Sequence, residues 1–476
     1  MGTPASLTVD GTEQIRTALC RMRGGFVATR PEGRLHGVLD LFPDTASIDA
    51  GGELVLGGVG ATDLAREFGT PLVVLDESTL RARARAYRQA APDALIVYGT
   101  KAFPNVAVLE VLAEEGLGAD VSTLGELEFA VAAQVPAERL VVHGNNKSDA
   151  ELARAAEVGA GLVVLDATEE LDRAAAARIE RVLLRVTPGI DADTHASIRT
   201  GHAGSKFGFT PEAAVEAVTR ARELGLGPVG LHVHLGSQLV DARAGWASIS
   251  WLAGFASTCA RATGWSPELV DLGGGLAVRH VPDEPNPSID HFVSELVQRV
   301  ERGFAAHALP TPRLVLEPGR SVVGPAGVTL YRIGVVKEAA DATRWVAVDG
   351  GMSDNPRPQL YDARYTALIA DRAGEGPTAT YSVGGKHCES GDVLIRRVAL
   401  ANPRRGDVLA VPVTGAYTLA MASNYNGVPR PAAVLVADGQ ARLIRRRETV
   451  DDLLGLEAPA SGSRHESGTD TTHDPR

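Results

Sequence analysis

A repeated unit in the middle of the chain limits the possible folds more than any other feature of the sequence. Each unit has a short apolar run, a turn with a polar residue and an Ala-, Glu- and Arg-rich amphipathic stretch. The eight runs are LIVYGTK (95–101), GADVST (118–123), LVVHGNN (140–146), LVVLDA (162–167), VLLRVTPG (182–189), VGLHVHLGS (229–237), LVDLGGG (269–275) and LVLEPGR (314–320). Apolar strands that alternate with helices predict a parallel sheet covered on both faces.

Eight such units over roughly 230 residues match the size of a (β/α)8 barrel of the TIM type. A doubly wound open sheet is the alternative, although its usual G-x-G-x-x-G after the first strand is missing. After about residue 325 the pattern changes to strands joined by turns, with one helical insert near 359–372. We therefore expect an α/β chain with two domains, a barrel and a mainly antiparallel β domain that N-terminal strands complete.

The expected boundaries follow from these patterns. Residues 1–70 contain short strand-like pieces, GVLDLFP and ELVLGG, that would join the β domain. Residues 71–325 would form the barrel, residues 326–457 the C-terminal β domain and residues 458–476 a disordered Ser/Gly/Thr/Asp-rich tail.

Composition excludes several classes of partner. Lys+Arg 47 against Asp+Glu 59 gives a net charge of −12, which is the wrong sign for binding nucleic-acid phosphates. No stretch approaches the roughly 20 apolar residues that span a bilayer, and residues 1–25 have no apolar signal core. The three cysteines, Cys20, Cys259 and Cys388, are far apart in the sequence and indicate a reducing compartment. We expect a cytoplasmic protein with no nucleic-acid or membrane partner.

Polar residues stand where the predicted barrel strands end, and barrel enzymes assemble their sites at that end. The residues in question are Lys101, Asp120, His143, His232, His234, Ser237, Gly273, Gly274, Gly275, Glu317, Pro318, Gly319 and Arg320. The glycine turns after the last two strands let backbone N–H groups approach an anion closely, as a phosphate site requires. A lysine, a phosphate cradle, an acid and a histidine together suit pyridoxal 5'-phosphate, with the lysine as the attachment point.

Two other interpretations of these residues remain open. Each residue alone has an ordinary role, since strand-end lysines are usually solvated and GGG is often only a tight turn. His232 and His234 share one strand face, and HxH on a barrel strand binds Zn²⁺ or another divalent metal in some hydrolases. Such a metal-dependent hydrolase needs further ligands, for which His143 and Asp166 are candidates.

Nine ordered motifs then give a specific resemblance. They are YGTKAF, HGNNKS, SKFGF, HVHLGSQ, VDLGGG, LEPGR, VDGGMSDNPRPQLYDARY, GKHCESGD and GAYTLAMASNYN, and the match around them runs from about residue 60 to 457. Their order resembles diaminopimelate decarboxylases, which belong to the alanine-racemase-like fold type III of pyridoxal-phosphate enzymes. VDGGMSDN, KHCESGD and the ending RRRETVDDLL are most similar to the actinobacterial members.

The resemblance implies roles for individual residues. For the cofactor it implies Lys101 as the Schiff-base lysine, His234 stacked on the ring, Glu317 at the pyridine nitrogen, and phosphate contacts from Ser237, Gly273 to Gly275, and the Glu317-Pro318-Gly319-Arg320 turn. For the substrate it implies Arg320, Arg357, Tyr361 and Glu389, with Tyr417 touching both substrate and cofactor phosphate. Cys388 is the implied general acid. Cys388 and Glu389 would reach the site of the neighbouring subunit in a homodimer, and no metal is implied.

The function that the resemblance implies is decarboxylation of meso-2,6-diaminopimelate to L-lysine and CO2, the last step of that route to lysine. The alternatives are a pyridoxal-phosphate decarboxylase of a related diamino acid, such as ornithine, lysine, arginine or a secondary metabolite, and the metal hydrolase. A protein that only binds the cofactor is a non-enzymatic alternative, which the predicted β domain disfavours. Thr100 and Ala420 depart from residues common at these positions and leave room for a modified substrate.

Overall fold

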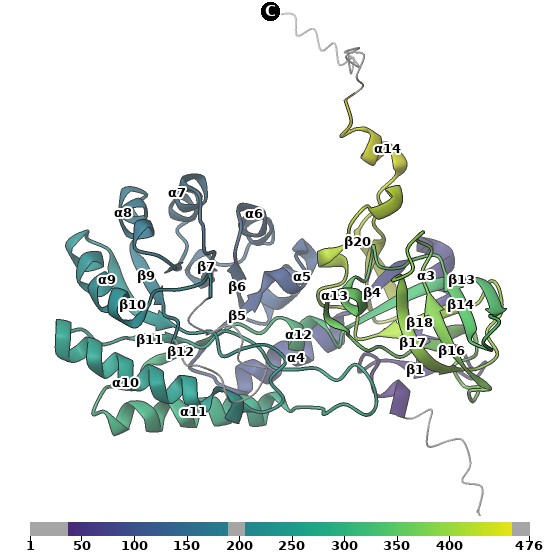
Figure 1. Ribbon diagram of the computed structural model, residues 1–476, viewed down its shortest axis with the longest axis horizontal. Coiled ribbons are helices and arrows are strands. Elements are labelled where there is room, and N and C mark those ends of the chain that lie inside the picture. The colour runs from purple at the N-terminus through teal and green to yellow at the C-terminus, as the bar shows by residue number, and fades with distance from the viewer. Residues whose placement is uncertain (1–36, 189–204, 459–476) are drawn as a thin grey trace, which may run out of the picture.

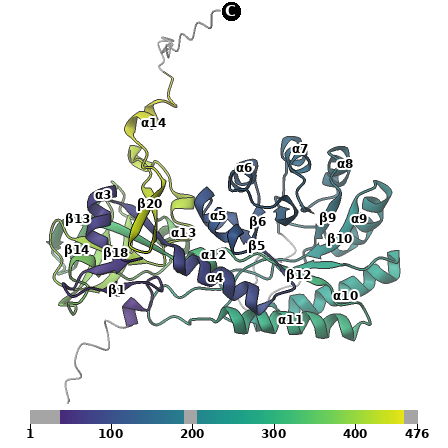
Figure 2. The same cartoon turned by 180° about the vertical axis from the view of Figure 1, so that it is seen from behind.

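A computed structural model describes residues 37–188 and 205–458 of the chain (Figure 1). Cys20, most of the predicted N-terminal segment and the tail from residue 459 lie outside these residues. The described chain has a barrel on one side and a β domain on the other, as the views from front and back both show (Figures 1 and 2).

Eight parallel strands close the barrel in the order β10-β11-β12-β5-β6-β7-β8-β9. They are β5 (Leu95–Gly99), β6 (Gly118–Val121), β7 (Leu140–Val142), β8 (Leu162–Leu165), β9 (Arg181–Arg185), β10 (Gly227–His232), β11 (Leu269–Asp271) and β12 (Arg313–Leu316). Pairing of Val315 with Leu95 joins the last strand to the first and closes the barrel. These are the eight apolar runs of the sequence, and the barrel prediction is confirmed.

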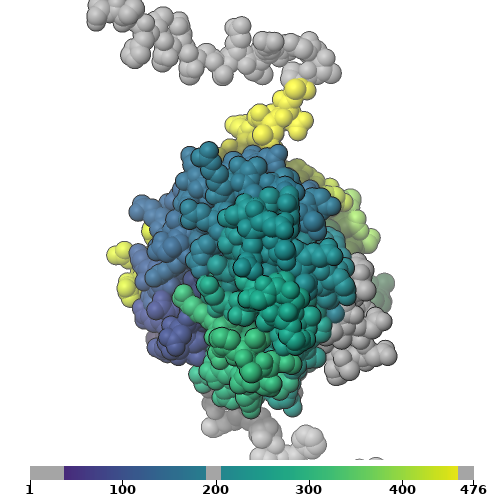
Figure 3. All heavy atoms as spheres, turned by 90° about the vertical axis from the view of Figure 1, so that its left-hand side faces the viewer, coloured from purple at the N-terminus to yellow at the C-terminus, as the bar shows by residue number. Residues whose placement is uncertain are grey.

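Helices cover the outside of the barrel. They are α4 (Glu77–Ala90), α5 (Val106–Glu114), α6 (Leu124–Ala132), α7 (Asp149–Glu157), α8 (Glu169–Ala176), α9 (Pro211–Glu223), α10 (Trp246–Thr263), α11 (Ile289–Ala306) and the one-turn α12 (Arg320–Val323). Side-chain caps fix where many of them begin: at α7, Ser148 and Glu151 form a reciprocal capping box. Seen from the barrel side, the surface is formed by the middle of the chain, and the segment around α14 (Val450–Leu454) projects clear of it (Figure 3).

The second domain is built on a nine-stranded sheet. Its strands are β4 (Leu72–Asp76), β13 (Gly327–Glu338), β14 (Arg344–Val348), β15 (Leu368–Ile369), β16 (Ala379–Gly384), β17 (Val393–Leu400), β18 (Val408–Pro412), β19 (Ala432–Ala437) and β20 (Gln440–Arg445). Its pairs are antiparallel except β14 with β16 and β4 with β19. The fold therefore agrees with the expected barrel and mainly antiparallel β domain.

Strand β4 lies in this second sheet, between β13 and β19, although residues 71–76 were placed at the start of the predicted barrel. All five of its residues are buried, so its apolar pattern is the same as that of a barrel strand. Asp76 at its end caps α4 by accepting from Thr79 N. The chain thus passes from the β domain to the barrel within one residue.

The N-terminal segment contributes in a different way from the one expected. β1 (Ser47–Ile48), β2 (Leu54–Leu56) and β3 (Val59–Gly60) form their own small antiparallel sheet, followed by α3 (Ala61–Phe68). Leu54 and Leu56 pack into the same core as Val328 and Val434 of the large sheet. GVLDLFP is not a strand, since residues 37–39 are helical.

The expected helical insert near 359–372 is shorter and interrupted. It consists of α13 (Arg357–Tyr361) and the 3-10 turn η5 (Ala370–Arg372), with β15 between them. No helix among residues 37–188 and 205–458 is both long and apolar enough to cross a membrane.

Candidate active site

The ends of the barrel strands bring the predicted polar residues together. The pocket at this end is lined by Gly99, Lys101, His234, Ser237, Gln238, Gly274, Gly275, Leu276, Glu317, Gly319, Arg320, Ser321 and Tyr417. All but Tyr417 come from the barrel. The Tyr417 backbone N–H donates to the carbonyl of Ala102 at 2.9 Å, which fastens this β-domain loop to the end of β5.

Lys101 lies in the 3-10 turn η1 (Thr100–Ala102) that follows β5, and its side chain is half-exposed in the pocket. Its Nζ donates to Oδ2 of Asp120, at the end of β6, at 3.0 Å. The carboxylate of Asp120 is the main cause that raises the pKa of Lys101, so the free amine holds its proton firmly. Asp120 is therefore the nearest acceptor for that proton when the amine has to react as a nucleophile.

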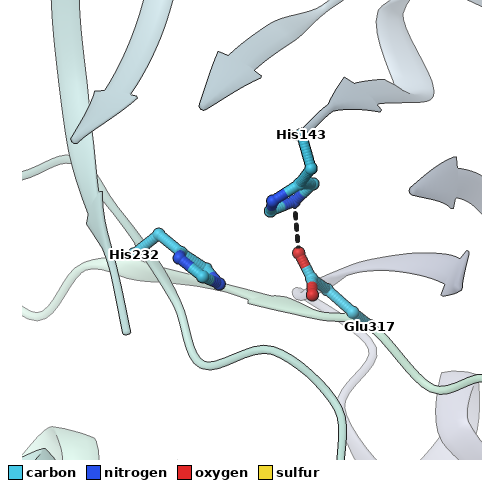
Figure 4. Close-up of side chains that lie close together, drawn as sticks. All are labelled: His143, His232 and Glu317. Atoms are coloured by element: carbon cyan, nitrogen blue, oxygen red, sulfur yellow. Dashed lines mark ion pairs between the residues drawn. The ribbon is translucent and has the colours of Figure 1, made fainter. Parts of the chain in front are cut away.

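His143, His232 and Glu317 form a buried cluster beneath the pocket (Figure 4). Nε2 of His143 lies 2.5 Å from Oε1 of Glu317, at an angle that does not make a regular hydrogen bond. Burial opposes the charge of Glu317, but His143 and Lys101 together hold the pKa of Glu317 well below its usual value. Burial lowers the pKa of His232 well below normal, so that ring is neutral. Glu317 is thus an ionised carboxylate under the pocket.

The same three residues have donor atoms within 4.8 Å of one another, close enough to share a metal ion. His232 belongs to this set and His234 does not, so the HxH pair does not act as a unit. Asp271, next to the cluster, has its pKa raised well above normal by burial and by the charge of Glu317. It accepts from Gly273 N at 2.8 Å and so fixes the start of the glycine turn.

The glycine turn 273–275 passes so close to its neighbours that side chains have no room. A Cβ on Gly273 would lie 2.3 Å from Nδ1 of His234, and one on Gly274 2.2 Å from the carbonyl oxygen of Glu317. Gly273 and Gly275 also have φ values of +68° and +111°, which favour glycine. Burial and the charge of Lys101 lower the pKa of His234 to about 4, so this partly buried ring is neutral and presents an uncharged face.

Arg320 begins α12 directly after β12, and its guanidinium lies over the ring of Tyr417, 4.6 Å from the centroid. Its Nη1 is buried and has no hydrogen-bond partner among the described residues. Burial and the adjacent charge of Arg357 lower the pKa of Arg320 to about 10, so it remains a cation at neutral pH. Two guanidinium groups near enough for one charge to lower the pKa of the other favour an anion between them.

Arg357, the first residue of α13, is buried, and its Nη1 contacts Nε2 of His280 at 2.9 Å and the hydroxyl of Tyr365 at 2.5 Å. Tyr361, at the other end of the same helix, is exposed. Neither residue lines the pocket described above, although the charge of Arg357 acts on Arg320, which does.

Cys388 and Glu389 are exposed on a loop of the β domain and do not line the pocket of their own chain. The loop is firmly held: Asp392 accepts from the backbone N–H groups of His387 and Met352. Asn426 Oδ1 also accepts from Cys388 N at 3.3 Å. Cys388 and Glu389 therefore stand exposed on a loop held by several hydrogen bonds.

The structure also brings to the site three residues that the sequence did not indicate, Asp271, His280 and Tyr365. Asp271 is the last residue of β11, and its strand-end position is the same signal that identified Asp120, His143 and His232. His280 and Tyr365 had no such signal, because they contact Arg357 from separate loops.

Comparisons with known proteins define the class. A family model described as the pyridoxal binding domain of pyridoxal-dependent decarboxylases matches residues 77–324, from the start of α4 to the end of the barrel. The barrel and its strand-end site are therefore those of a pyridoxal-dependent decarboxylase.

Similarity to named proteins identifies the family within this class. A diaminopimelate decarboxylase of Actinosynnema pretiosum is 47% identical over 85% of this chain and 93% of its own length. The enzyme of Bacillus subtilis is 41% identical over 86% of this chain and 96% of its own. The crystal structure of diaminopimelate decarboxylase from M. jannaschii superposes with a TM-score of 0.82 at 32% identity, over 88% of this chain and 99% of that one. The chain belongs to the diaminopimelate decarboxylase family, and the predicted resemblance is confirmed.

Proposed function

We propose that this chain decarboxylates meso-2,6-diaminopimelate to L-lysine and CO2 with pyridoxal 5'-phosphate. The observation that carries the proposal is the pair of adjacent guanidinium groups, Arg320 and Arg357, beside the Lys101 pocket. Each has a buried nitrogen without a partner among the described residues. A substrate with a second carboxylate, far from the one that is lost, supplies the missing acceptors.

The residues present fit the cofactor. A turn that excludes side chains at Gly273 and Gly274 leaves main-chain amides as the only groups that can face a phosphate there, with Ser237 and Gly319 close by. Glu317 is an ionised carboxylate that would hold the ring nitrogen protonated, and neutral His234 would lie against the ring face. Lys101 would hold the cofactor covalently. When bound, the cofactor supplies the ring that takes up the electron pair left by the departing CO2.

The chain's own residues accept the proton of Lys101 and orient the substrate. Lys101 must lose a proton to react, and Asp120 Oδ2 at 3.0 Å is placed to receive it. Arg320 and Arg357 bind the distal carboxylate, and Tyr361 contributes from the same helix as Arg357. Tyr417, against the Arg320 guanidinium, limits how far that arginine can move. The reacting end is thereby held at Lys101 and the distal end at the arginines.

After CO2 has left, the substrate carbon that carried it must receive a proton. We infer that Cys388 of a second copy donates this proton from Sγ, and that Glu389 of the same copy pairs with the distal ammonium. Both side chains are exposed on a rigid loop, and their positions match the family's motif. The active unit is then a homodimer, and an exposed working thiol fits a reducing compartment such as the cytoplasm.

The experiment is a substrate panel on purified protein. We expect the absorbance of bound pyridoxal phosphate and CO2 release from meso-diaminopimelate, with little from ornithine, arginine or lysine. Turnover of ornithine in preference to diaminopimelate would assign the chain to a related decarboxylase. Bound zinc at His143, His232 and Glu317, with no cofactor absorbance, would favour the metal hydrolase.

A further inference from the structure

A barrel loop reaches across to the β domain and contacts the helix that carries Arg357. The loop lies between β11 and α11, over residues 272–288. Its His280 contacts Arg357 at 2.9 Å, and its Asp283 accepts two hydrogen bonds from Arg364, at 2.8 and 2.9 Å, just after α13. The barrel therefore holds α13 at two points, of which only His280 touches the guanidinium.

The contact decides which edge of Arg357 stays free. Its Nη1 has two hydrogens, and these point to His280 Nε2 and to the Tyr365 hydroxyl. Nε of Arg357 is buried and has no partner among residues 37–188 and 205–458. The edge formed by Nε and Nη2 is the one that binds a carboxylate with two parallel hydrogen bonds. Occupation of Nη1 thus leaves this edge as the part of the guanidinium that is available to a ligand.

His280 is suited to the task by its own surroundings. Arginine only donates, so Nε2 of His280 must be the acceptor and its proton must lie on Nδ1. Nδ1 lies 3.8 Å from Oε2 of Glu284, which also accepts from His280 N at 2.8 Å. Burial lowers the pKa of His280, against the opposing effect of Glu284, and so favours the neutral ring that can accept. The ring is fixed from both sides.

We propose that His280 is a positioning residue that orients Arg357 for the distal carboxylate of the substrate, and so selects substrates that carry one. The proposal rests on the proposed function, because it takes Arg357 as the carboxylate binder. His280 touches neither the pocket at Lys101 nor the cofactor-binding turn, so its effect falls on recognition of the distal end.

The test compares three substitutions at this position. In His280→Gln the amide oxygen takes nearly the place of Nε2, whereas in His280→Asn the shorter side chain cannot reach Arg357. His280→Ala removes the acceptor entirely. We expect His280→Ala and His280→Asn to raise KM for meso-diaminopimelate about tenfold, the effect of losing one hydrogen bond to a charged group. His280→Gln should restore most of the affinity.

Further measurements separate positioning from general damage. In the His280 variants, kcat should stay within about threefold of the wild type, and so should the Kd for pyridoxal phosphate measured by absorbance titration. L-lysine keeps the distal carboxylate, so its Ki should rise together with KM. The matched control is His291→Ala, since His291 is exposed on α11. An unchanged KM in His280→Asn, or an equal loss of cofactor affinity, would overturn the proposal. Failure of the wild type to release CO2 from diaminopimelate would instead overturn the proposed function.

Discussion

Nε2 of His143 and Oε1 of Glu317 lie 2.5 Å apart and join the ends of strands β7 and β12 beneath the pocket (Figure 4). His143 is the strongest of the effects that lower the pKa of Glu317 against its burial. A carboxylate keeps a ring nitrogen protonated only while the carboxylate itself is ionised. The contact therefore links His143, predicted at a strand end but with no role toward the cofactor, to the proposed role of Glu317.

Replacing His143 with asparagine should move the acid side of the pH–kcat profile upward. A carboxylate with a lowered pKa is charged above that pKa and loses its charge as the pH falls through it, so a higher pKa in the variant brings the loss at higher pH. We expect kcat at neutral pH to fall about tenfold, less than the roughly 10²–10⁴-fold effect of a general acid or base, because His143 acts only through Glu317. The checks are the pH profile of kcat and the pH dependence of the cofactor absorbance. An unchanged acid side in both would contradict the assigned link.

The exposed position of Cys388 allows a test of whether two subunits share each active site. Cys388→Ala and Lys101→Ala should each be nearly inactive alone, while Cys388→Ala keeps its cofactor absorbance. In a random mixture half of the dimers are mixed, and each mixed dimer has one intact site, so about a quarter of wild-type activity should return. If both residues act within one chain, mixing restores nothing. Equal amounts of wild type and Lys101→Ala should give half of the wild-type activity whether or not subunits exchange, and provide the reference for the quarter expected above.

One methyl group added to the glycine turn should weaken binding of the cofactor. Gly274→Ala would place Cβ 2.2 Å from the carbonyl oxygen of Glu317, so the turn must move away from its position. We expect the Kd for pyridoxal phosphate to rise at least about tenfold, because main-chain anion sites depend on backbone position. Gly125→Ala, in helix α6 with only Thr123 Oγ1 at 3.9 Å, is the matched control and should bind normally. Equal affinities in the two variants would show that the turn does not bind the phosphate.

Much of the fold was predictable because its signals are local. The barrel strands are short and largely apolar, most are followed by an amphipathic helix, and every one of the eight runs became a barrel strand. β4 has the same pattern, yet it pairs with β13 and β19, because a buried strand has no local feature that tells one sheet from another.

The same difference between local and long-range signals decides which residues of the site were predictable. Lys101, His234 and Glu317 follow strands and carry a recognisable chemistry, so their meeting in one pocket could be foreseen. The contact of Arg357 with His280 joins residues 77 positions apart in two domains, and neither is marked by a strand end. Its existence depends on how the domains pack, which no local pattern contains.

We expect the buried ion pair between Lys147 and Glu170 to stabilise the folded chain near the site. Lys147 Nζ donates to Glu170 Oε2 at 3.0 Å and to the carbonyls of Gly144 and Val164, each at 2.7 Å. Both side chains are almost fully buried. Lys147→Met would leave the Glu170 carboxylate buried and unpaired, so we expect the free energy of unfolding to fall by about 3–5 kcal/mol. Urea unfolding followed by circular dichroism measures it.

Two further variants identify the cause of that loss. Lys147→Met combined with Glu170→Leu removes both charges and should regain much of the stability, since an apolar pair of similar volume is often as stable as a buried ion pair. Arg154→Met breaks the more exposed pair Arg154–Glu128, 2.7 Å apart, and should change the free energy by no more than about 1 kcal/mol. If the double variant is as unstable as Lys147→Met, the lysine acts through its bonds to Gly144 and Val164. In that case the turn that follows His143 depends on Lys147, and the double variant should also show the pH profile of His143→Asn.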